Sequence, residues 1–284
     1  MADNETKLVE AVVTANRILA NEGILDVFGH ISVRSERNPS EFLLSCSRSP
    51  AAVSAADIMR YRLDGSQVTR SDWKPYVERI IHGAIYRARS DVRAVCHGHS
   101  DGILPFAATG EPIRPVIHIG TMFWEGVGWF DRYDEGGNML VSSAAEGRAL
   151  AEAVGPRRAA LLRNHGFVVV GANLIEAVMA AIYLDKNACV QMQAARLGRV
   201  NYITPEEGRR GSKVFESPGV QQRAWGYWVA RLPHGWRKDA GLTSGAPSRR
   251  APKAGQTPRR TSRAKAKRSG TAQPKARRGG ASHS

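Results

Sequence analysis

The stretch from residue 78 to residue 99, which reads ERIIHGAIYRARSDVRAVCHGH, decides the fold. Its first part continues a segment that begins at Pro75 and has the pattern of a helix up to Arg89, and proline suits a first helical turn. Its second part, from Asp91 to His99, alternates apolar and polar residues in the manner of a strand. The stretch therefore predicts a helix that leads directly into a strand.

His97 and His99 close this strand and are its most informative residues. Residues i and i+2 of a strand point to the same face, so both imidazoles should project into one space, with Gly98 leaving room between them. His165 lies in a turn after another apolar segment and would be a third member. Three neutral imidazoles that leave coordination positions open are typical of a catalytic metal site. The alternative is that they are polar residues at a strand end and in a turn.

Glu78 is the nearest carboxylate upstream of the histidine pair. A carboxylate there would complete the metal shell or move protons, and the alternative is a glutamate on a solvated helix face. His82 lies four residues later on the same helix face, which makes a hydrogen bond between the two side chains plausible. Cys96 should point to the opposite face of the strand, so we exclude it from the metal shell.

Further helices and strands are expected on both sides of this stretch. Apolar periodicity and capping residues predict helices over three ranges: 5–22, 143–155 and 173–198. Gly23 follows the first of them, where a helix end favours a positive φ. Short apolar segments between turn-rich stretches predict strands of an antiparallel or mixed sheet: 30–34, 42–45, 59–63, 159–163 and 167–170.

The run from Glu78 to His99 resembles the signature of the class II aldolase/adducin family. Residues 161–166, LLRNHG, resemble the later His-Gly motif of that family, and residues 28–34, FGHISVR, resemble its early loop. The resemblance covers roughly residues 5–205, with the order and separation of the motifs respected. It implies a fold of the α/β class, a three-layer α/β/α domain with a central, mainly antiparallel sheet. It also implies a four-fold symmetric homotetramer with active sites between subunits.

The same resemblance implies roles for individual residues. His97, His99 and His165 would bind one divalent metal ion per subunit, and Glu78 would be a further ligand or the catalytic acid/base. The metal would act as a Lewis acid that stabilises negative charge on an enolate or phenolate oxygen while a carbon–carbon bond breaks. Imidazole and carboxylate ligands suit manganese, zinc, iron and cobalt, and the sequence does not choose among these metals.

The chain departs from the members of the family that cleave phosphorylated sugars. Those members share a Gly-Asn-x-Ser loop and small hydroxyl residues before the catalytic glutamate, whereas this chain has GHIS at residues 29–32 and KPYV at residues 74–77. The early loop and residues 44–50, LSCSRSP, look instead like the branch that decarboxylates hydroxylated aromatic or pyridine carboxylic acids. Arg48 offers a planar fork for a substrate carboxylate, with Ser47 as a neutral donor beside it. A surface salt bridge is the alternative role of Arg48.

The mechanism expected for this branch begins with metal chelation of a ring hydroxyl and its adjacent carboxylate, while His30 and Arg48 orient the acid. Proton transfer to the carbon that bears the carboxylate lets CO2 leave, with Glu78, His30 or His118 as the proton source. A packed core or interface histidine is the alternative for His118. Two other functions stay open: an aldolase that cleaves an unphosphorylated hydroxy-keto acid, and a non-catalytic, adducin-like binding protein, against which the retained histidines argue.

Charge divides the chain into two parts. Of the 41 Lys and Arg residues, 12 lie in residues 240–284, which contain no acidic residue, so residues 1–239 carry 29 basic and 26 acidic groups. We expect the first part to be the catalytic domain and the second, rich in Ser, Gly and Pro, to be a disordered tail. Twelve positive charges without aromatic residues fit nonspecific attraction to polyanions, and a tail without a partner is the alternative.

Cysteine usage and hydropathy indicate where such an enzyme would work. The three cysteines form no CxxC pair, so neither a disulfide framework nor a thiolate zinc site is expected. The N-terminus lacks the pattern of a signal peptide, and no apolar run is long enough for a membrane span. We therefore expect a cytoplasmic protein with a small-molecule carboxylic acid as substrate and no membrane contact.

Overall fold

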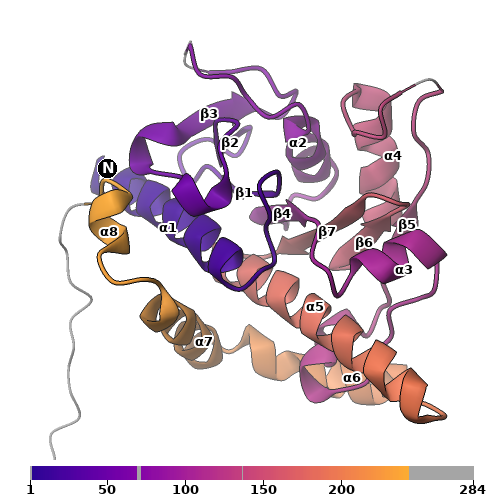
Figure 1. Ribbon diagram of the computed structural model, residues 1–284. Coiled ribbons are helices and arrows are strands. Elements are labelled where there is room, and N and C mark those ends of the chain that lie inside the picture. Colours follow the sequence, from indigo (N-terminus) through magenta and orange to yellow (C-terminus); the bar gives the residue numbers. More distant parts are fainter. Residues whose placement is uncertain (1, 69–71, 136, 243–284) are drawn as a thin grey trace, which may run out of the picture. The chain divides into compact units, whose positions relative to one another are not determined.

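The computed structural model describes residues 2–68, 72–135 and 137–242 (Figure 1). The chain divides into two units, Met1–Ser244 and Gly245–Ser284, and the second unit lies outside the described residues. Among the described helices, none combines the length and the apolar character that crossing a membrane requires.

Within the described residues, seven strands form one sheet in the order β3-β2-β1-β4-β7-β6-β5. The strands are β1 (His30–Arg34), β2 (Glu41–Ser45), β3 (Ile58–Arg62), β4 (Ala94–Gly98), β5 (Gly128–Phe130), β6 (Ala159–Leu162) and β7 (Gly166–Gly171). Every neighbouring pair is antiparallel except β5 and β6, which run parallel. The mainly antiparallel sheet is therefore confirmed, and β4 lies at its centre.

Helices cover both faces of this sheet (Figure 1). The α-helices are α1 (Ala2–Asn21), α2 (Arg79–Ala88), α3 (Leu104–Thr109), α4 (Ala144–Val154), α5 (Leu174–Leu197), α6 (Pro205–Ser212), α7 (Pro218–Arg231) and α8 (Trp236–Asp239). The short 3-10 helices are η1 (Pro50–Ala52), η2 (Ala55–Asp57), η3 (His118–Phe123) and η4 (Lys213–Glu216).

Two hydrophobic cores show the layers. On one face of the sheet, Val12 of α1 and Val178 of α5 share a core with Cys96 of β4. On the other face, Ile81 of α2 shares a second core with Val95 of β4 and with side chains of α4. Neighbouring strand residues point to opposite faces, so β4 contributes to both cores. The predicted three-layer α/β/α architecture is confirmed.

Capping side chains fix the helix starts that the sequence predicted. Ser143 caps α4 by accepting a hydrogen bond from the backbone N–H of Glu146, whose carboxylate bonds back to the Ser143 backbone. Asn173 caps α5 by accepting from the backbone N–H of Glu176. These bonds satisfy amide groups that the first turn of a helix leaves without partners. Gly23, after α1, has the expected positive φ, 72°.

The start of α2 differs from the prediction. The helix begins at Arg79 and not at Pro75, because Pro75 forms an isolated antiparallel bridge with Cys46. Pairing with a distant extended segment outweighs the preference of proline for a first helical turn. Glu78 consequently occupies the N-cap position of α2, where the chain changes direction.

The folded part of the chain extends past the predicted boundary at residue 239. Ala240 and Leu242 are 0% and 6% exposed in the core to which α1 contributes, and the Ala55 N–H donates to the Ala240 carbonyl oxygen. The folded unit therefore includes at least the residues up to Leu242. The disordered basic tail stays a prediction, since residues 243–284 lie outside the described residues.

Candidate metal centre and active site

β4 and the turn between β6 and β7 bring three histidines together. His97 follows Cys96, whose side chain lies in the core on the opposite face, as predicted. His99 comes directly after β4, and His165 lies in the β6–β7 turn, where Asn164 has a positive φ of 54°. In the part of the chain that the structure describes, one nitrogen from each histidine lies within 4.8 Å of the other two. The predicted cluster is therefore present.

Two glycines allow close backbone contacts around the histidine cluster. A Cβ atom on Gly166 would lie 2.4 Å from the carbonyl oxygen of Gly98 and 2.7 Å from the His99 ring. A Cβ atom on Gly98 would lie 2.9 Å from the Ile24 carbonyl oxygen. Both contacts with backbone are shorter than real Cβ atoms show. A larger residue at position 166 would therefore push the β6–β7 turn away from His99, and one at position 98 would push β4 away from the segment after α1.

The ring orientations of His97 and His99 leave two bare nitrogen atoms facing each other. His97 Nδ1 lies 2.9 Å from the carbonyl oxygen of Phe167, and His99 Nδ1 lies 3.0 Å from Asp26 Oδ1. A carbonyl or a carboxylate oxygen only accepts hydrogen bonds, so both ring protons belong on Nδ1. The two Nε2 atoms are 3.1 Å apart, and neither has a proton to donate to the other.

This arrangement fits a bound cation. Two lone pairs that face each other in a buried site repel unless a positive charge lies between them. Imidazole nitrogens bind zinc at about 2.0–2.1 Å, which places two of them roughly 3.0–3.4 Å apart on one ion. The observed separation of 3.1 Å between the Nε2 atoms of His97 and His99 agrees with that range. His165 and Glu78 would supply the remaining protein ligands.

Glu78 faces the same point from the start of α2. Its Oε2 lies 3.5 Å from His97 Nε2 and 3.7 Å from His165 Nε2, and its Oε1 accepts the Val141 N–H at 3.0 Å. Burial raises the pKa of Glu78, but the neighbouring His97 and His165 imidazoles and the Val141 amide outweigh it and lower the pKa to about 2. Glu78 is therefore a carboxylate, able to bind a cation or accept a proton.

Asp26 is a site residue that the sequence analysis missed. Its Oδ1 accepts from the backbone N–H groups of Phe28 and Gly29, both at 2.9 Å, as well as from His99 Nδ1. A carboxylate that holds the far nitrogen of a metal-binding histidine fixes its tautomer and orientation. The Asx turn at Asp26-Val27-Phe28 was the available signal, because aspartate often bonds backbone amides two residues on.

The cluster opens into a cavity of about 640 Å³, here named the histidine cavity. It is lined by Asp26, Val27, Phe28, His30, Ser47, Arg48, Ser49, Tyr76, Val77, Glu78, His99, Leu140 and His165. Seven of the eight site residues predicted from the sequence are therefore together, six in the lining and His97 buried behind it. Val27 and Phe28, 62% and 70% exposed, form an apolar edge.

His118 is the eighth predicted site residue, and the structure places it elsewhere. It lies in η3, it is exposed, and its ring packs 5.3 Å from that of Phe215. It does not line the histidine cavity. The proline-bounded segment before it suggested a strand that would face the site, but residues 111–117 form neither a strand nor a helix.

Arg48 forms a salt bridge and also lines the histidine cavity. Its Nε pairs with Oδ1 of the buried Asp57 at 2.9 Å, and its guanidinium carbon lies 5.4 Å from the centroid of the Trp73 ring. Asp57 is itself held by the backbone N–H and the hydroxyl of Ser54, at 2.8 and 2.7 Å. This chain of contacts holds the guanidinium on the wall of the histidine cavity, 38% exposed to solvent.

His82 makes different contacts from the ones expected. Its Nε2 lies 2.7 Å from His30 Nδ1 and its Nδ1 lies 2.6 Å from Ser32 Oγ, so it supports His30, and no hydrogen bond joins it to Glu78. Burial, and then the neighbouring His97 ring, lower the pKa of His82 to about 3, so its ring is neutral. His30 and Ser32 point toward α2 because they alternate with Ile31, which faces the other core.

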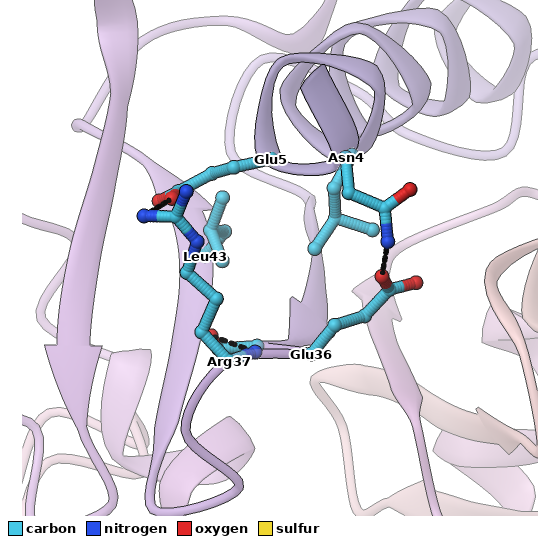
Figure 2. A pocket seen from close by; sticks show the side chains of 7 residues that line it. Asn4, Glu5, Glu36, Arg37 and Leu43 are labelled. Carbon is cyan, nitrogen blue, oxygen red and sulfur yellow. Dashed lines mark hydrogen bonds and ion pairs between the residues drawn. The ribbon is translucent and has the colours of Figure 1, made fainter. Parts of the chain in front are cut away.

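A second cavity, of about 540 Å³, lies beside the N-terminal end of α1 (Figure 2). This α1 cavity is lined by Asn4, Glu5, Leu8, Ser35, Glu36, Arg37 and Leu43. Glu5 pairs with Arg37 at 2.6 Å, and Asn4 Nδ2 donates to Glu36 Oε2 at 2.5 Å. Figure 2 shows these side chains directed at one another across the space. Each of these four side chains has a protein partner, and nothing there indicates a ligand.

Comparisons with known proteins identify the family of this chain. The family model for the class II aldolase and adducin N-terminal domain matches residues 10–192. The decarboxylase tropJ of Talaromyces stipitatus is 30% identical over 252 residues, which span 80% of this chain and 94% of the relative. A 3,4-dihydroxyphthalate decarboxylase of Arthrobacter keyseri is 29% identical over 245 residues, with the same two coverages of 80% and 94%.

The fold has solved counterparts. L-fuculose 1-phosphate aldolase from Glaciozyma antarctica superposes with a TM-score of 0.69 and 23% identity, covering 83% of this chain and 92% of that one. This chain belongs to the class II aldolase and adducin family. Its relatives in sequence include decarboxylases, as expected from the early loop. Decarboxylases and aldolases are both lyases, so the comparisons support an enzyme of the lyase class.

Proposed function

We propose that this protein is a divalent-metal-dependent decarboxylase of a hydroxylated aromatic or pyridine carboxylic acid. One observation carries the proposal. A single cavity contains two imidazole nitrogens that face each other without a proton between them, an arginine and an apolar edge. Those three features suit an oxygen chelator, a carboxylate and a planar ring, respectively. The relatives named as decarboxylases, one of them for 3,4-dihydroxyphthalate, support the same chemistry.

His97, His99 and His165 would hold the ion, with Glu78 as a further ligand or as the group that moves the proton. The bound ion would supply Lewis-acid stabilisation of negative charge on a substrate oxygen. Nitrogen and oxygen donors of this kind suit manganese, zinc, iron or cobalt.

The remaining residues would position the acid. Arg48 would pair with a carboxylate through its planar fork, and Ser47 would donate a further hydrogen bond. The side chains of Val27, Phe28 and Val77 would contact the faces of the ring. With the carboxylate at Arg48 and the ring faces against these side chains, the edge of the ring that bears the hydroxyl would point towards the histidines.

Glu78 would carry the proton. Because the pKa of Glu78 is lowered to about 2, it starts as a base and accepts the proton of the ring hydroxyl. It then returns that proton to the ring carbon that carries the carboxylate. The carbon–carbon bond to the carboxylate breaks, CO2 leaves, and its bonding electrons restore the aromatic ring and leave the ring oxygen as an anion, which takes up one proton from solvent to become the hydroxyl group again.

The test is CO2 release by the metal-reconstituted protein from a panel of ortho-hydroxy aromatic and pyridine carboxylic acids. We expect release from at least one acid and none from the His97→Ala variant. Binding of metal without CO2 release from any acid would contradict the decarboxylase proposal. The aldolase that cleaves an unphosphorylated hydroxy-keto acid would then take its place.

Two further proposals concern the whole protein. We propose a homotetramer, and a basic tail that attracts polyanions nonspecifically. Deleting residues 243–284, which spares the buried Leu242, should leave CO2 release intact. Retention of the full chain on a polyanion resin at moderate salt should disappear with the tail, and retention that persists would contradict the second proposal. Sedimentation measures the subunit count directly.

A further inference from the structure

A chain of four buried side chains leads from the histidine cavity into the core between β1 and α2. His30 Nδ1 lies 2.7 Å from His82 Nε2, His82 Nδ1 lies 2.6 Å from Ser32 Oγ, and Ser32 Oγ lies 2.8 Å from the Tyr86 hydroxyl. All four residues are at most 1% exposed. Each of these three contacts has hydrogen-bond length and holds one proton.

This chain of hydrogen bonds ends at Tyr86, and the contacts of Tyr86 determine which group donates in each bond. Ser32 Oγ is the acceptor that the described residues offer to the Tyr86 hydroxyl, so Tyr86 donates to Ser32. Ser32 has a single hydrogen and gives it to Nδ1 of His82. The proton of the neutral His82 ring is then on Nε2 and is donated to Nδ1 of His30. In the reverse direction the buried Tyr86 hydrogen would have no acceptor in the described structure.

His30 is the outlet of this chain. With Nδ1 accepting from His82, its own proton must be on Nε2, which is buried and has no hydrogen-bond partner. His30 lines the histidine cavity between Tyr76, at 4.5 Å between ring centroids, and His97, at 5.2 Å. An unpaired buried N–H is costly, and a ligand oxygen that accepts from it removes the cost.

We propose that His82 is a positioning residue which, through Ser32 and Tyr86, locks His30 as a neutral Nε2–H donor for an anionic oxygen of the substrate. These hydrogen bonds fix the tautomer of His30 and do not conduct protons, because Tyr86 at their far end is buried and does not reach solvent. Burial raises the pKa of the Tyr86 hydroxyl, so Tyr86 holds its proton. His30 would therefore orient the substrate and would not protonate it, which leaves the proton transfer to Glu78.

The lock itself is independent of the proposed function, whereas the anionic oxygen as its target rests on that function. Nuclear magnetic resonance of the full chain with ¹⁵N-labelled histidines, loaded with diamagnetic Zn²⁺, separates protonated from bare ring nitrogens. We expect the His30 signals, assigned by their loss in His30→Gln, to show a protonated Nε2 and a bare Nδ1. A wild-type His30 with its proton on Nδ1 would overturn the proposal.

Two mild variants test the cause of the lock. Tyr86→Phe and Ser32→Ala each remove one hydroxyl, and each should let a second set of His30 signals appear, with the proton on Nδ1. Tyr61→Phe is the matched control, because Tyr61 is 0% exposed in the same core as Tyr86, which is 1% exposed, but bonds to Met59 Sδ. Its His30 signals should equal those of the wild type. Unchanged signals in both Tyr86→Phe and Ser32→Ala would overturn the role of the chain.

The target is tested with 2-hydroxybenzoate as probe. If half of His30 adopts the wrong tautomer in Tyr86→Phe, the dissociation constant of the probe should rise about twofold, because only the competent fraction binds. A rise in Tyr61→Phe of the same size would overturn the link between tautomer and binding. Failure of the wild type to bind the probe would count against the proposed function and against the anionic oxygen as target, while the tautomer result would stand by itself.

Discussion

The histidine cavity and the α1 cavity are similar in volume, about 640 and 540 Å³, but their polar atoms are used differently. In the α1 cavity, Glu5 pairs with Arg37 and Asn4 with Glu36. In the histidine cavity, bare nitrogens face each other and His30 Nε2 has no partner. Volume therefore does not identify a site here. Buried polar atoms without a protein partner identify it instead. Leaving such an atom unpaired costs free energy, which indicates that a ligand binds there.

The largest effect that this comparison predicts is on catalysis at Glu78. Glu78→Gln keeps an oxygen for the Val141 N–H but removes the negative charge, so CO2 release should fall by about 100-fold or more. Initial rates at saturating metal measure the loss. Glu146→Gln is the matched control, since Glu146 is a buried carboxylate that also accepts backbone N–H groups but lies outside both cavities. An equal loss of activity in both variants would show that the effect does not depend on the place of Glu78 in the histidine cavity.

The next effect concerns the residue that orients His99. Asp26→Asn keeps the oxygen that accepts from Phe28 and Gly29 but removes the charge beside His99 Nδ1. Metal affinity should fall by about 10- to 100-fold, measured by competition with a chelator of known affinity. Asp64→Asn serves as control, because Asp64 accepts from the Ser66 N–H in a similar exposed turn. An affinity unchanged in Asp26→Asn would show that the turn alone orients His99.

A smaller effect should appear in the pH dependence of stability. Burial lowers the pKa of His82 to about 3 and that of His165 to about 4, so between these values and the ordinary 6.5 the unfolded chain binds more protons than the native state. The free energy of unfolding should therefore fall as the pH drops from about 6.5 towards 4, by up to about 1.4 kcal/mol per pH unit for each group. Denaturant titrations with a chelator present measure it.

The His82→Gln variant measures how much one histidine contributes to this pH dependence of the free energy of unfolding. His82→Gln should flatten the loss of stability on acidification, because the substituted residue does not titrate. Glu5→Gln, in the α1 cavity, should leave the slope between pH 6.5 and 5 unchanged. Identical slopes in the wild type and in His82→Gln would show that the acid sensitivity has another origin.

The smallest effect is expected in the α1 cavity itself. Glu5 pairs with Arg37 and Arg60, and its side chain is 23% exposed. Such partly exposed pairs contribute about 0.2–1 kcal/mol, and salt weakens them. Glu5→Gln should lower the free energy of unfolding by that amount at low salt, by less at high salt, and should not change CO2 release. A loss of activity with unchanged stability would give the α1 cavity a role that its paired charges do not suggest.

The sequence predicted the elements better than the contacts between them. The strand from His30 to Arg34 and the caps at Ser143 and Asn173 depend on neighbours in the chain, and the structure confirms all three. The histidine cluster was predictable because the i, i+2 rule places His97 and His99 on one face. These features rest on local periodicity or on a motif of known spacing.

The features that were missed depend on residues far apart in sequence. Pro75 pairs with Cys46 instead of starting a helix, and His82 bonds to His30, 52 residues earlier. Asp26 reaches His99 across 73 residues. No periodicity indicates such pairs, because they depend on how β1, β4 and α2 pack. His118 lies outside the histidine cavity of its own chain for the same reason, since a histidine after an apolar segment carries no sign of the direction it faces.

The structural elements that carry the site residues have a consequence for the evolution of substrate range. His97 is in the central strand, and His99 and His165 adjoin the glycine contact that binds β4 to the β6–β7 turn. The apolar edge and the residues around Arg48 belong to connecting loops. Exchange of Phe28 or Ser49 can thus reshape the pocket while the three histidines proposed to bind the metal keep their positions. Libraries for a new acid should vary those loops and leave the two glycines untouched.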